Sequence, residues 1–373
     1  MPGLPCINNR RPSGILTRLT NWPAKDLPGM SRDSFLREQD CSEHSYSLIG
    51  EDWGPRRYFR IPLKANNRTA ILMESVADNA PESMPGHKIS DFLRIGRALR
   101  AAGLHAPEIM AAREEEGLVL LEDLGGVRFY DALERGEEAA PLYRLATDVL
   151  VHLRKYFLNN TLNLPLYKDS HIHEGRRRVV DWYLPMALKR KNPAGLVQEY
   201  LAVWTEIEQN LPSCPQGFVH GDYHAQNLMW LPQETGLNRC GILDFQGALW
   251  GPLPYDLVNL AEDIRRDVPE DIRDDMMARY TQGMDGQGRE AFSLWYRVIG
   301  TQFHCRVIGQ VLKLALKGGK TAPLKNLPGI QAYLRAGLEY PVLRPLKDWF
   351  GGQGVDFNEA LDLSDKFVSP DAF

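Results

Sequence analysis

The sequence predicts an α+β protein of two lobes, a small antiparallel β-rich lobe followed by a larger, mainly helical one. Three observations predict this fold. Short runs rich in β-branched and aromatic residues gather between residues 46 and 74. Apolar residues at helical spacing dominate the chain beyond residue 140. Two short apolar strands interrupt those helices, and each leads into an acidic motif. We expect the lobes to cover residues 30–121 and 122–373.

Composition sets the broad class. The 373 residues are 43% hydrophobic and 25% charged, as in soluble globular proteins, which excludes disordered and collagen-like chains. The net charge of −4 gives no basic footprint for nucleic acid, and no apolar run is long enough to span a bilayer. The five cysteines form no C-x-x-C pair, which favours reduced thiols. We therefore expect a cytoplasmic monomer without nucleic-acid or membrane partners.

The first 29 residues differ from the rest. They hold four basic residues, a single acidic one and several prolines, with no apolar periodicity. This composition predicts a disordered tail at residues 1–29. Ser31 is a suitable N-cap for a short helix that begins the first lobe.

The first lobe begins with strands. Residues 46–49, 56–61 and 69–73 are strand-like and are separated by polar turns. A helix follows that begins near Ser90 and ends at Gly103, and residues 119–121 form another strand.

The second lobe is mainly helical. Residues 142–157 and 196–211 carry apolar side chains at i, i+3 and i+4 spacing. The interrupting strands are residues 217–219 and 240–243. The chemistry of the chain follows these two strands.

The first acidic motif is His-Gly-Asp-Tyr-His-Ala-Gln-Asn at residues 220–227. Asp222 precedes Asn227 by five positions, which is the spacing of the catalytic loop in kinases. A carboxylate placed here can take a proton from an attacking hydroxyl, and an amide oxygen one turn later can reach a phosphate-bound metal ion. The motif predicts phosphoryl transfer.

The second motif is Leu-Asp-Phe-Gln at residues 243–246. Asp244 ends an apolar strand, as does the Mg²⁺-binding Asp of the kinase Asp-Phe-Gly motif. Magnesium prefers oxygen ligands and keeps several waters, so one Asp, one Asn and nucleotide phosphates suffice to bind it. Together the two motifs favour an ATP- and Mg²⁺-dependent kinase.

These motifs resemble those of the aminoglycoside phosphotransferase superfamily, which has a protein-kinase-like fold. The resemblance is strongest to the bacterial anomeric kinases of N-acetylmuramate and N-acetylglucosamine in cell-wall recycling, and covers most of the chain from Met30. Besides the motifs, it rests on residues 56–60, 72–73, 99–109, 120–125, 181–185 and 251–257.

The resemblance implies a role for each matching residue. Asp222 would be the catalytic base, and Asn227 and Asp244 would bind Mg²⁺. Asp256 would hold the catalytic loop. Independently of the resemblance, we expect His220 to pack this loop and not to react. The backbone at Glu122, Asp123 and Leu124 would be the hinge that binds the adenine of ATP.

The resemblance also implies an acceptor pocket for an amino sugar. Glu174 would bind sugar hydroxyls, and Trp182 and Tyr183 would line the pocket, although Trp182 is equally suited to a core. His224 either touches the substrate or fills space. Three arginines at residues 176–178 fit a solvated helix face, or alternatively attract an acidic substrate such as a muramic acid.

Departures from the family pattern leave the acceptor open. Gly221, Gln226 and Gly247 stand where the sugar kinases usually carry Arg, Arg and Asp. The third strand offers Met73 in place of the phosphate-binding Lys of protein kinases.

Arg57 and Arg60 are the candidates to replace that lysine, because a guanidinium can bind phosphate bidentately; strand-surface charges are the alternative. Two other functions remain: a kinase for an aminoglycoside, choline or homoserine-like acceptor, and a nucleotide-binding pseudokinase. An acidic pocket would favour an aminoglycoside.

Overall fold

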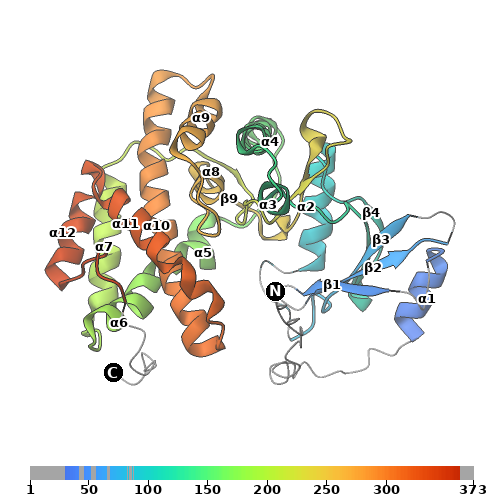
Figure 1. The fold of residues 1–373 in the computed structure, drawn as a ribbon, viewed down its shortest axis with the longest axis horizontal. Helices are drawn as coiled ribbons and strands as arrows, with labels where there is room; N and C mark the ends of the chain where they lie inside the picture. The colour runs from blue at the N-terminus through green and yellow to red at the C-terminus, as the bar shows by residue number, and fades with distance from the viewer. Residues whose placement is uncertain are drawn as a thin grey trace, which may run out of the picture.

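The computed structural model describes residues 30–41, 46–51, 56–64, 68–81, 83, 86 and 88–361. The tail expected at residues 1–29 lies outside these ranges. A five-stranded sheet with its helices forms one part of the molecule, and a larger group of helices forms the other (Figure 1). The predicted α+β arrangement, with the β-rich part first, is confirmed.

The sheet of the first lobe is antiparallel throughout, in the order β1-β2-β3-β5-β4. Its strands are β1 Ser47–Glu51, β2 Arg57–Pro62, β3 Thr69–Glu74, β4 Ile109–Arg113 and β5 Leu118–Glu122. Alternate residues face opposite sides. Phe59, Leu72 and Leu120 pack with α1 (Met30–Glu38), whereas Met73 and Val119 join the cluster that contains α2 (Ile89–Ala101).

The second lobe is built on helices, and a 33-residue helix, α10, is the longest. The helices are α3 Phe129–Glu134, α4 Ala139–Asn159, α5 His171–Glu174, α6 Leu184–Leu188, α7 Leu196–Gln209, α8 Pro254–Ala261, α9 Glu270–Thr281, α10 Gly286–Gly318, α11 Leu327–Leu338 and α12 Arg344–Gln353. Short helical segments η2 (Tyr167–Asp169), η3 (Gly175–Arg177), η4 (Val179–Tyr183) and η6 (Phe245–Gly247) lie in the connections. Of the helices in the described ranges, none is both long and apolar enough to cross a membrane.

Two small antiparallel pairs position the acidic motifs. Strand β6 (Gln216–Val219) pairs with β9 (Leu249–Pro252), and β7 (Leu228–Trp230) pairs with β8 (Cys240–Ile242). The loop 220–227 therefore joins β6 to β7, and the motif 243–246 follows β8 directly. The amide of Leu243 also donates to the carbonyl of Asn227 over 3.0 Å, which joins the two motifs.

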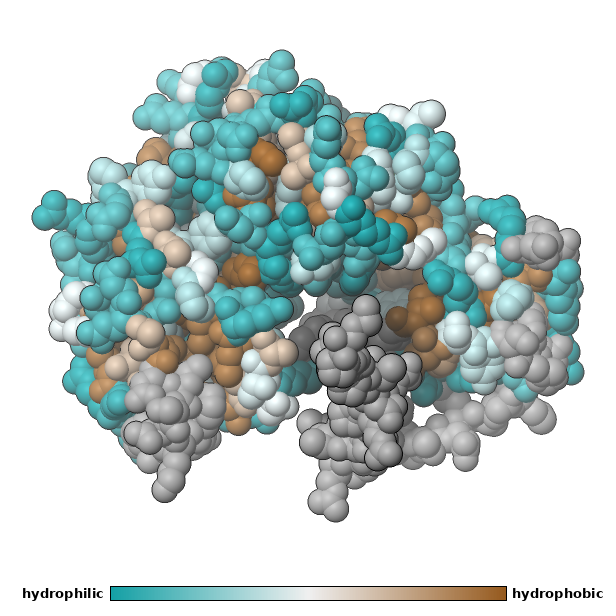
Figure 2. Space-filling view, viewed as in Figure 1, coloured by the Kyte–Doolittle hydropathy of each residue, from teal (hydrophilic) through white to brown (hydrophobic). Residues whose placement is uncertain are grey.

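Phe245 anchors the second motif beneath the first lobe. Its ring stacks on Phe92 of α2 with centroids 4.9 Å apart. A Cβ at Gly96 would lie 3.1 Å from the Phe245 ring, so the small residue makes room for it. Figure 2 shows the surface hollowed between the two lobes. The second acidic motif lies where the lobes meet, because Phe245 contacts α2 of the first lobe.

Candidate active site

His220 fixes the backbone of the catalytic loop from within the core. Its Nε2 lies 3.0 Å from the Leu243 carbonyl, and its Nδ1 accepts the amide of Asp222 over 3.3 Å. These partners assign the proton to Nε2 in a neutral ring. Burial lowers the pKa of His220 to about 4, although the nearby Asp222 carboxylate acts in the opposite direction. These contacts hold His220 inside the core, and its packing role stays a prediction.

This lowered pKa makes part of the stability depend on pH. A base whose pKa falls on folding contributes fully above its unfolded pKa of 6.5, and loses that contribution as pH falls through about 4. We expect the unfolding free energy of the wild type to drop over this interval, at up to about 1.4 kcal/mol per pH unit from this residue. Urea denaturation at both ends should show a smaller drop in His220→Gln. Burial also lowers the pKa of His173 to about 4, and both proteins contain this residue. An equal drop in the two proteins would therefore assign the pH dependence to groups other than His220.

Asp222 follows Gly221, whose backbone conformation favours glycine. Gly221 has a φ of 90°, in the region where side chains are strained. The carboxylate of Asp222 is half exposed, at 50%, and its Oδ1 lies 3.2 Å from Nε2 of His224. Desolvation raises the pKa of this carboxyl, but the ring of His224 and the charge of Arg265 outweigh it and hold the pKa well below its usual range. Asp222 is therefore ionised at neutral pH, as a proton acceptor must be.

Asn227 joins the two acidic motifs. Its Nδ2 lies 3.0 Å from Oδ2 of Asp222 and 3.4 Å from Oδ2 of Asp244. Asp244 has a φ of 58°, in the left-handed region that few non-glycine residues adopt. Its Oδ1 accepts a hydrogen bond from Gln246, which orients the carboxylate.

These oxygens fit a magnesium ion. The Asp244 carboxylate and the Asn227 amide oxygen are hard ligands, and Mg²⁺ needs few of them when phosphates and waters complete its shell. Across the described ranges, no group of three or more His, Cys, Asp or Glu side chains could hold a metal by itself. A metal here would therefore be shared with the nucleotide.

Asp256 holds the catalytic loop from α8. Its Oδ2 accepts the amide of His220 over 2.6 Å, and its Oδ1 accepts the amide of Gly221 over 3.0 Å. Burial raises the pKa of Asp256 to about 7, against the lowering effect of those two donors. The two bonds set the direction in which Asp222 leaves the loop.

The segment expected to bind adenine follows β5. The side chain of Glu122 accepts the amide of Glu108 over 3.0 Å and lies 3.1 Å from Nε2 of His105. Leu124 lies over β8, where a Cβ at Gly241 would come within 2.9 Å of its Cδ1. The backbone at 122–124 thus lies between the sheet and the strand that precedes Asp244, the position that a hinge requires.

Asp123 ties this segment to the sheet. It is 6% exposed and accepts from Nε of Arg60 over 2.6 Å, from Oγ1 of Thr69 over 2.6 Å and from the amide of Gly125 over 2.9 Å. Desolvation raises the pKa of this carboxyl, but the Arg60 and Thr69 hydrogen bonds outweigh it and lower the pKa overall. Arg60 also donates to the Gly125 carbonyl. The guanidinium of Arg60 is thus engaged by Asp123 and the Gly125 carbonyl.

We expect Asp123→Asn to lower the unfolding free energy by about 2 kcal/mol. The amide group of the new asparagine would face Arg60, and the partly buried guanidinium of Arg60 would lose its charged partner. Urea denaturation measures the effect. Asp148→Asn is the matched control, because Asp148 pairs with Arg279 at the surface and such pairs contribute at most about 1 kcal/mol. Equal losses in the two variants would contradict the role assigned to Asp123.

Arg57 keeps more freedom than Arg60. Its Nη2 lies 2.9 Å from Glu74 on β3, and its side chain is 48% exposed. The neighbouring Met73 is buried and offers no charge. Of the two candidates for the missing lysine, only Arg57 has a largely exposed side chain.

The residues expected to line the acceptor pocket separate in the structure. Tyr183 is fully buried, where it stacks on Phe357 and its hydroxyl accepts from Gln331 over 3.0 Å, so it belongs to the core and does not line an open pocket. Trp182 is half buried, with the Lys317 ammonium 5.3 Å from its ring. Glu174 is exposed at the end of α5.

His224 is buried and contacts the Asp222 carboxylate within the catalytic loop.

Sequence reasoning missed two further residues. Gln246 orients Asp244, and its place in the Asp-Phe-Gln string was the available signal. Arg265 lies beyond the end of α8, where its Nη1 donates to Asp263 over 3.0 Å, and its charge lowers the pKa of Asp222. No local sequence pattern predicts this role.

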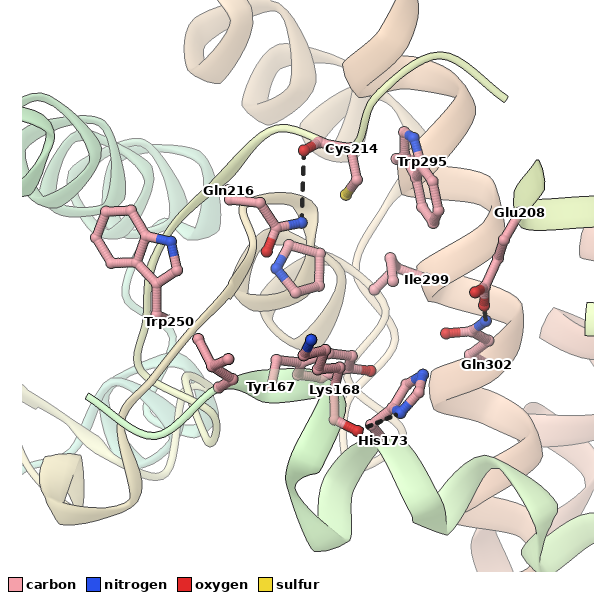
Figure 3. A pocket seen from close by; sticks show the side chains of 12 residues that line it. Tyr167, Lys168, His173, Glu208, Cys214, Gln216, Trp250, Trp295, Ile299 and Gln302 are labelled. Carbon is pink, nitrogen blue, oxygen red and sulfur yellow. Dashed lines mark hydrogen bonds between the residues drawn. The ribbon is translucent and has the colours of Figure 1, made fainter. Parts of the chain in front are cut away.

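A cavity of about 330 Å³ lies in the helical lobe. Figure 3 shows Trp250, Trp295, Gln302 and Glu208 around it, with Gln216 at the start of β6. Gln216 stands at the opposite end of β6 from the catalytic loop, and Asp222 is not among the residues that line this cavity.

Residues 45–295 match the phosphotransferase enzyme family. A protein of Caulobacter vibrioides named N-acetylmuramate/N-acetylglucosamine kinase is 31% identical, covering 73% of this chain and 77% of that one. A protein of the same name from Pseudomonas aeruginosa is also 31% identical, covering 83% and 94%.

Solved structures agree on the fold. The GDP complex of wild-type aminoglycoside 2'-phosphotransferase-IIIa superimposes with a TM-score of 0.51 at 14% identity, covering 83% of this chain and 93% of that one. A choline/ethanolamine kinase family protein from Mesorhizobium loti gives 0.52 at 15% identity, covering 82% and 91%. With its kinase-like lobes, its paired acidic motifs and a family match over most of its length, the chain belongs to the phosphotransferase enzyme family.

Proposed function

We propose that the protein uses ATP and Mg²⁺ to phosphorylate the anomeric hydroxyl of N-acetylmuramate or N-acetylglucosamine. The observation that carries this proposal is the juxtaposition of Asp222, Asn227 and Asp244 where the lobes meet. The two curated relatives at 31% identity, each named as a kinase of these sugars, support the choice of acceptor.

Asp222 would act on the attacking hydroxyl. In this reaction the anomeric oxygen forms a bond to the γ-phosphorus, the bond from that phosphorus to the β–γ bridging oxygen breaks, and ADP leaves with the electron pair. The proton of the anomeric hydroxyl passes to the carboxylate of Asp222, which is ionised and half exposed. His224 and Asn227 hold the carboxylate in place through contacts at 3.2 and 3.0 Å.

Asp244 and Asn227 would hold Mg²⁺, which neutralises negative charge on the phosphates when it is bound. The backbone at 122–124 would bind adenine, because the chain there is held rigidly by Asp123 and Glu122. Arg57 would bind the nucleotide phosphates in place of the missing third-strand lysine. The protein's own contribution is thus alignment of donor and acceptor, together with removal of one proton.

Release of ADP tests the proposal across a panel of acceptors with Mg·ATP: N-acetylmuramate, N-acetylglucosamine, glucose, kanamycin and choline. We expect turnover with the two N-acetyl sugars and background rates with the others. Turnover with kanamycin or choline alone would overturn the choice of acceptor. Nucleotide binding without turnover of any acceptor would favour a regulatory role instead.

A further inference from the structure

Two arginines from distant parts of the chain meet beside Gly175. Arg178 lies between η3 and η4, and Arg306 lies on α10. A Cβ at Gly175 would come within 3.0 Å of Cδ of Arg306 and 3.3 Å of Cζ of Arg178, so both side chains occupy the space that this glycine leaves. A Cβ at Gly309 would lie 2.1 Å from the carbonyl oxygen of Arg178, so the backbones of η3–η4 and α10 are in close contact. The packing fixes both arginines in place.

The hydrogen bond that Arg306 makes to Tyr255 does not neutralise the positive charge of the two arginines. Arg306 donates to the neutral hydroxyl of Tyr255 over 3.0 Å, and its Nε is buried without a hydrogen-bond partner. Burial and the adjacent Arg306 both lower the pKa of Arg178, while Glu174 and Asp181 act in the opposite direction. Asp181 already accepts from Arg177 over 2.9 Å, and Glu174 is exposed. Like charges held together in a half-buried place favour the binding of an anion between them.

The pair lies near the catalytic loop. Ile172, on the helix that precedes Gly175, comes within 3.5 Å of where a Cβ of Gly221 would stand. Tyr255, which holds Arg306, directly precedes Asp256, whose carboxylate holds that loop. An anion at the two arginines would therefore lie in the acceptor half of the site.

We propose that Arg178 and Arg306 bind the carboxylate of an acidic sugar acceptor and make the protein favour N-acetylmuramate over N-acetylglucosamine. This inference rests on the proposed function. The two sugars differ in the lactyl ether of N-acetylmuramate, which carries the carboxylate. Guanidinium groups bind carboxylates through paired, charge-assisted hydrogen bonds, and such bonds are among the strongest that side chains make.

Discrimination between the two sugars tests the proposal. We would measure kcat/KM for both in the wild type, Arg178→Gln, Arg306→Gln and Arg306→Lys. The ratio of N-acetylmuramate to N-acetylglucosamine should fall about 10- to 100-fold in each Gln variant, mainly through KM, and by less in Arg306→Lys, which keeps the charge. Arg144→Gln is the control, because it removes a surface charge that is paired with Asp275 and lies outside this cluster of arginines. Its ratio should stay that of the wild type.

A structural role gives a different result. If the arginines only support the fold, both sugars lose activity in proportion, the ratio does not move, and the proposal is overturned. Calorimetric titration of each sugar into the same proteins measures the preference without turnover. A wild type that phosphorylates neither sugar overturns the proposed function, whereas equal affinity for the two sugars overturns the carboxylate site.

Discussion

The Asp222→Asn variant is expected to lose about 10²- to 10⁴-fold in kcat, the usual contribution of a positioned general base. Asparagine keeps the shape of the side chain and its contact with Asn227, but it cannot accept the proton of the attacking hydroxyl. The half-exposed carboxylate, ionised at neutral pH, is the proton acceptor that the loop presents. Steady-state release of ADP with Mg·ATP and N-acetylmuramate measures the loss.

Two observations separate this loss from a folding defect. The melting temperature of Asp222→Asn should stay within a few degrees of the wild type. Asp275→Asn, which removes a surface carboxylate paired with Arg144, should keep full activity. Retention of more than about a tenth of the wild-type kcat by Asp222→Asn would show that another group accepts the proton.

The second large effect is expected for Asp256→Asn, with a loss of about 3 kcal/mol in unfolding free energy and a fall in kcat of about 10²-fold. The buried carboxylate accepts the amides of both His220 and Gly221. Asparagine has a single acceptor oxygen, so one of these buried N–H groups would lose its partner and the loop that carries Asp222 would shift. Urea denaturation and steady-state kinetics measure the two losses.

Asp271→Asn is the matched control for this prediction. Asp271 is exposed in the first turn of α9, so its replacement should change the unfolding free energy by no more than about 0.5 kcal/mol. Stability lost without any change in kcat would mean that Asp256 supports the fold but does not position the loop.

The paired acidic motifs were predictable because their information is local. Asp222 and Asn227 lie within one loop, and Asp244 follows a short strand that pairs with the strand after that loop. Helices α4 and α7 and the first three strands were predictable for the same reason, since each has its own periodicity. Strands β4, β7 and β9 were missed because they are short and carry little alternation.

Partners that are distant along the chain were not predictable. Arg60 and Asp123 are 63 positions apart, and only the folded sheet brings the two charges together. The resemblance to the sugar kinases implied that Tyr183 lines the acceptor pocket. The irregular helical turn at Val179–Tyr183 instead directs it into the core against Phe357. A residue's side of a helix depends on that local geometry, which composition does not reveal.

The three arginines at 176–178 show the same limit. As a run of charges they fit a solvated helix face, and Arg177 does pair at the surface with Asp181. Arg178 turns toward α10, where Gly175 and Gly309 leave the room that it needs beside Arg306. The meaning of the run therefore depends on a helix more than a hundred residues later.

Phosphorus NMR of the product shows whether the loop that carries Asp222 transfers a phosphoryl group to the anomeric oxygen. With Mg·ATP and N-acetylmuramate, the wild type should yield a phosphomonoester whose phosphorus couples to the anomeric proton, and Asp222→Asn should yield almost none. Phosphorus attached to another hydroxyl, or ADP formed without any sugar phosphate, would contradict the account.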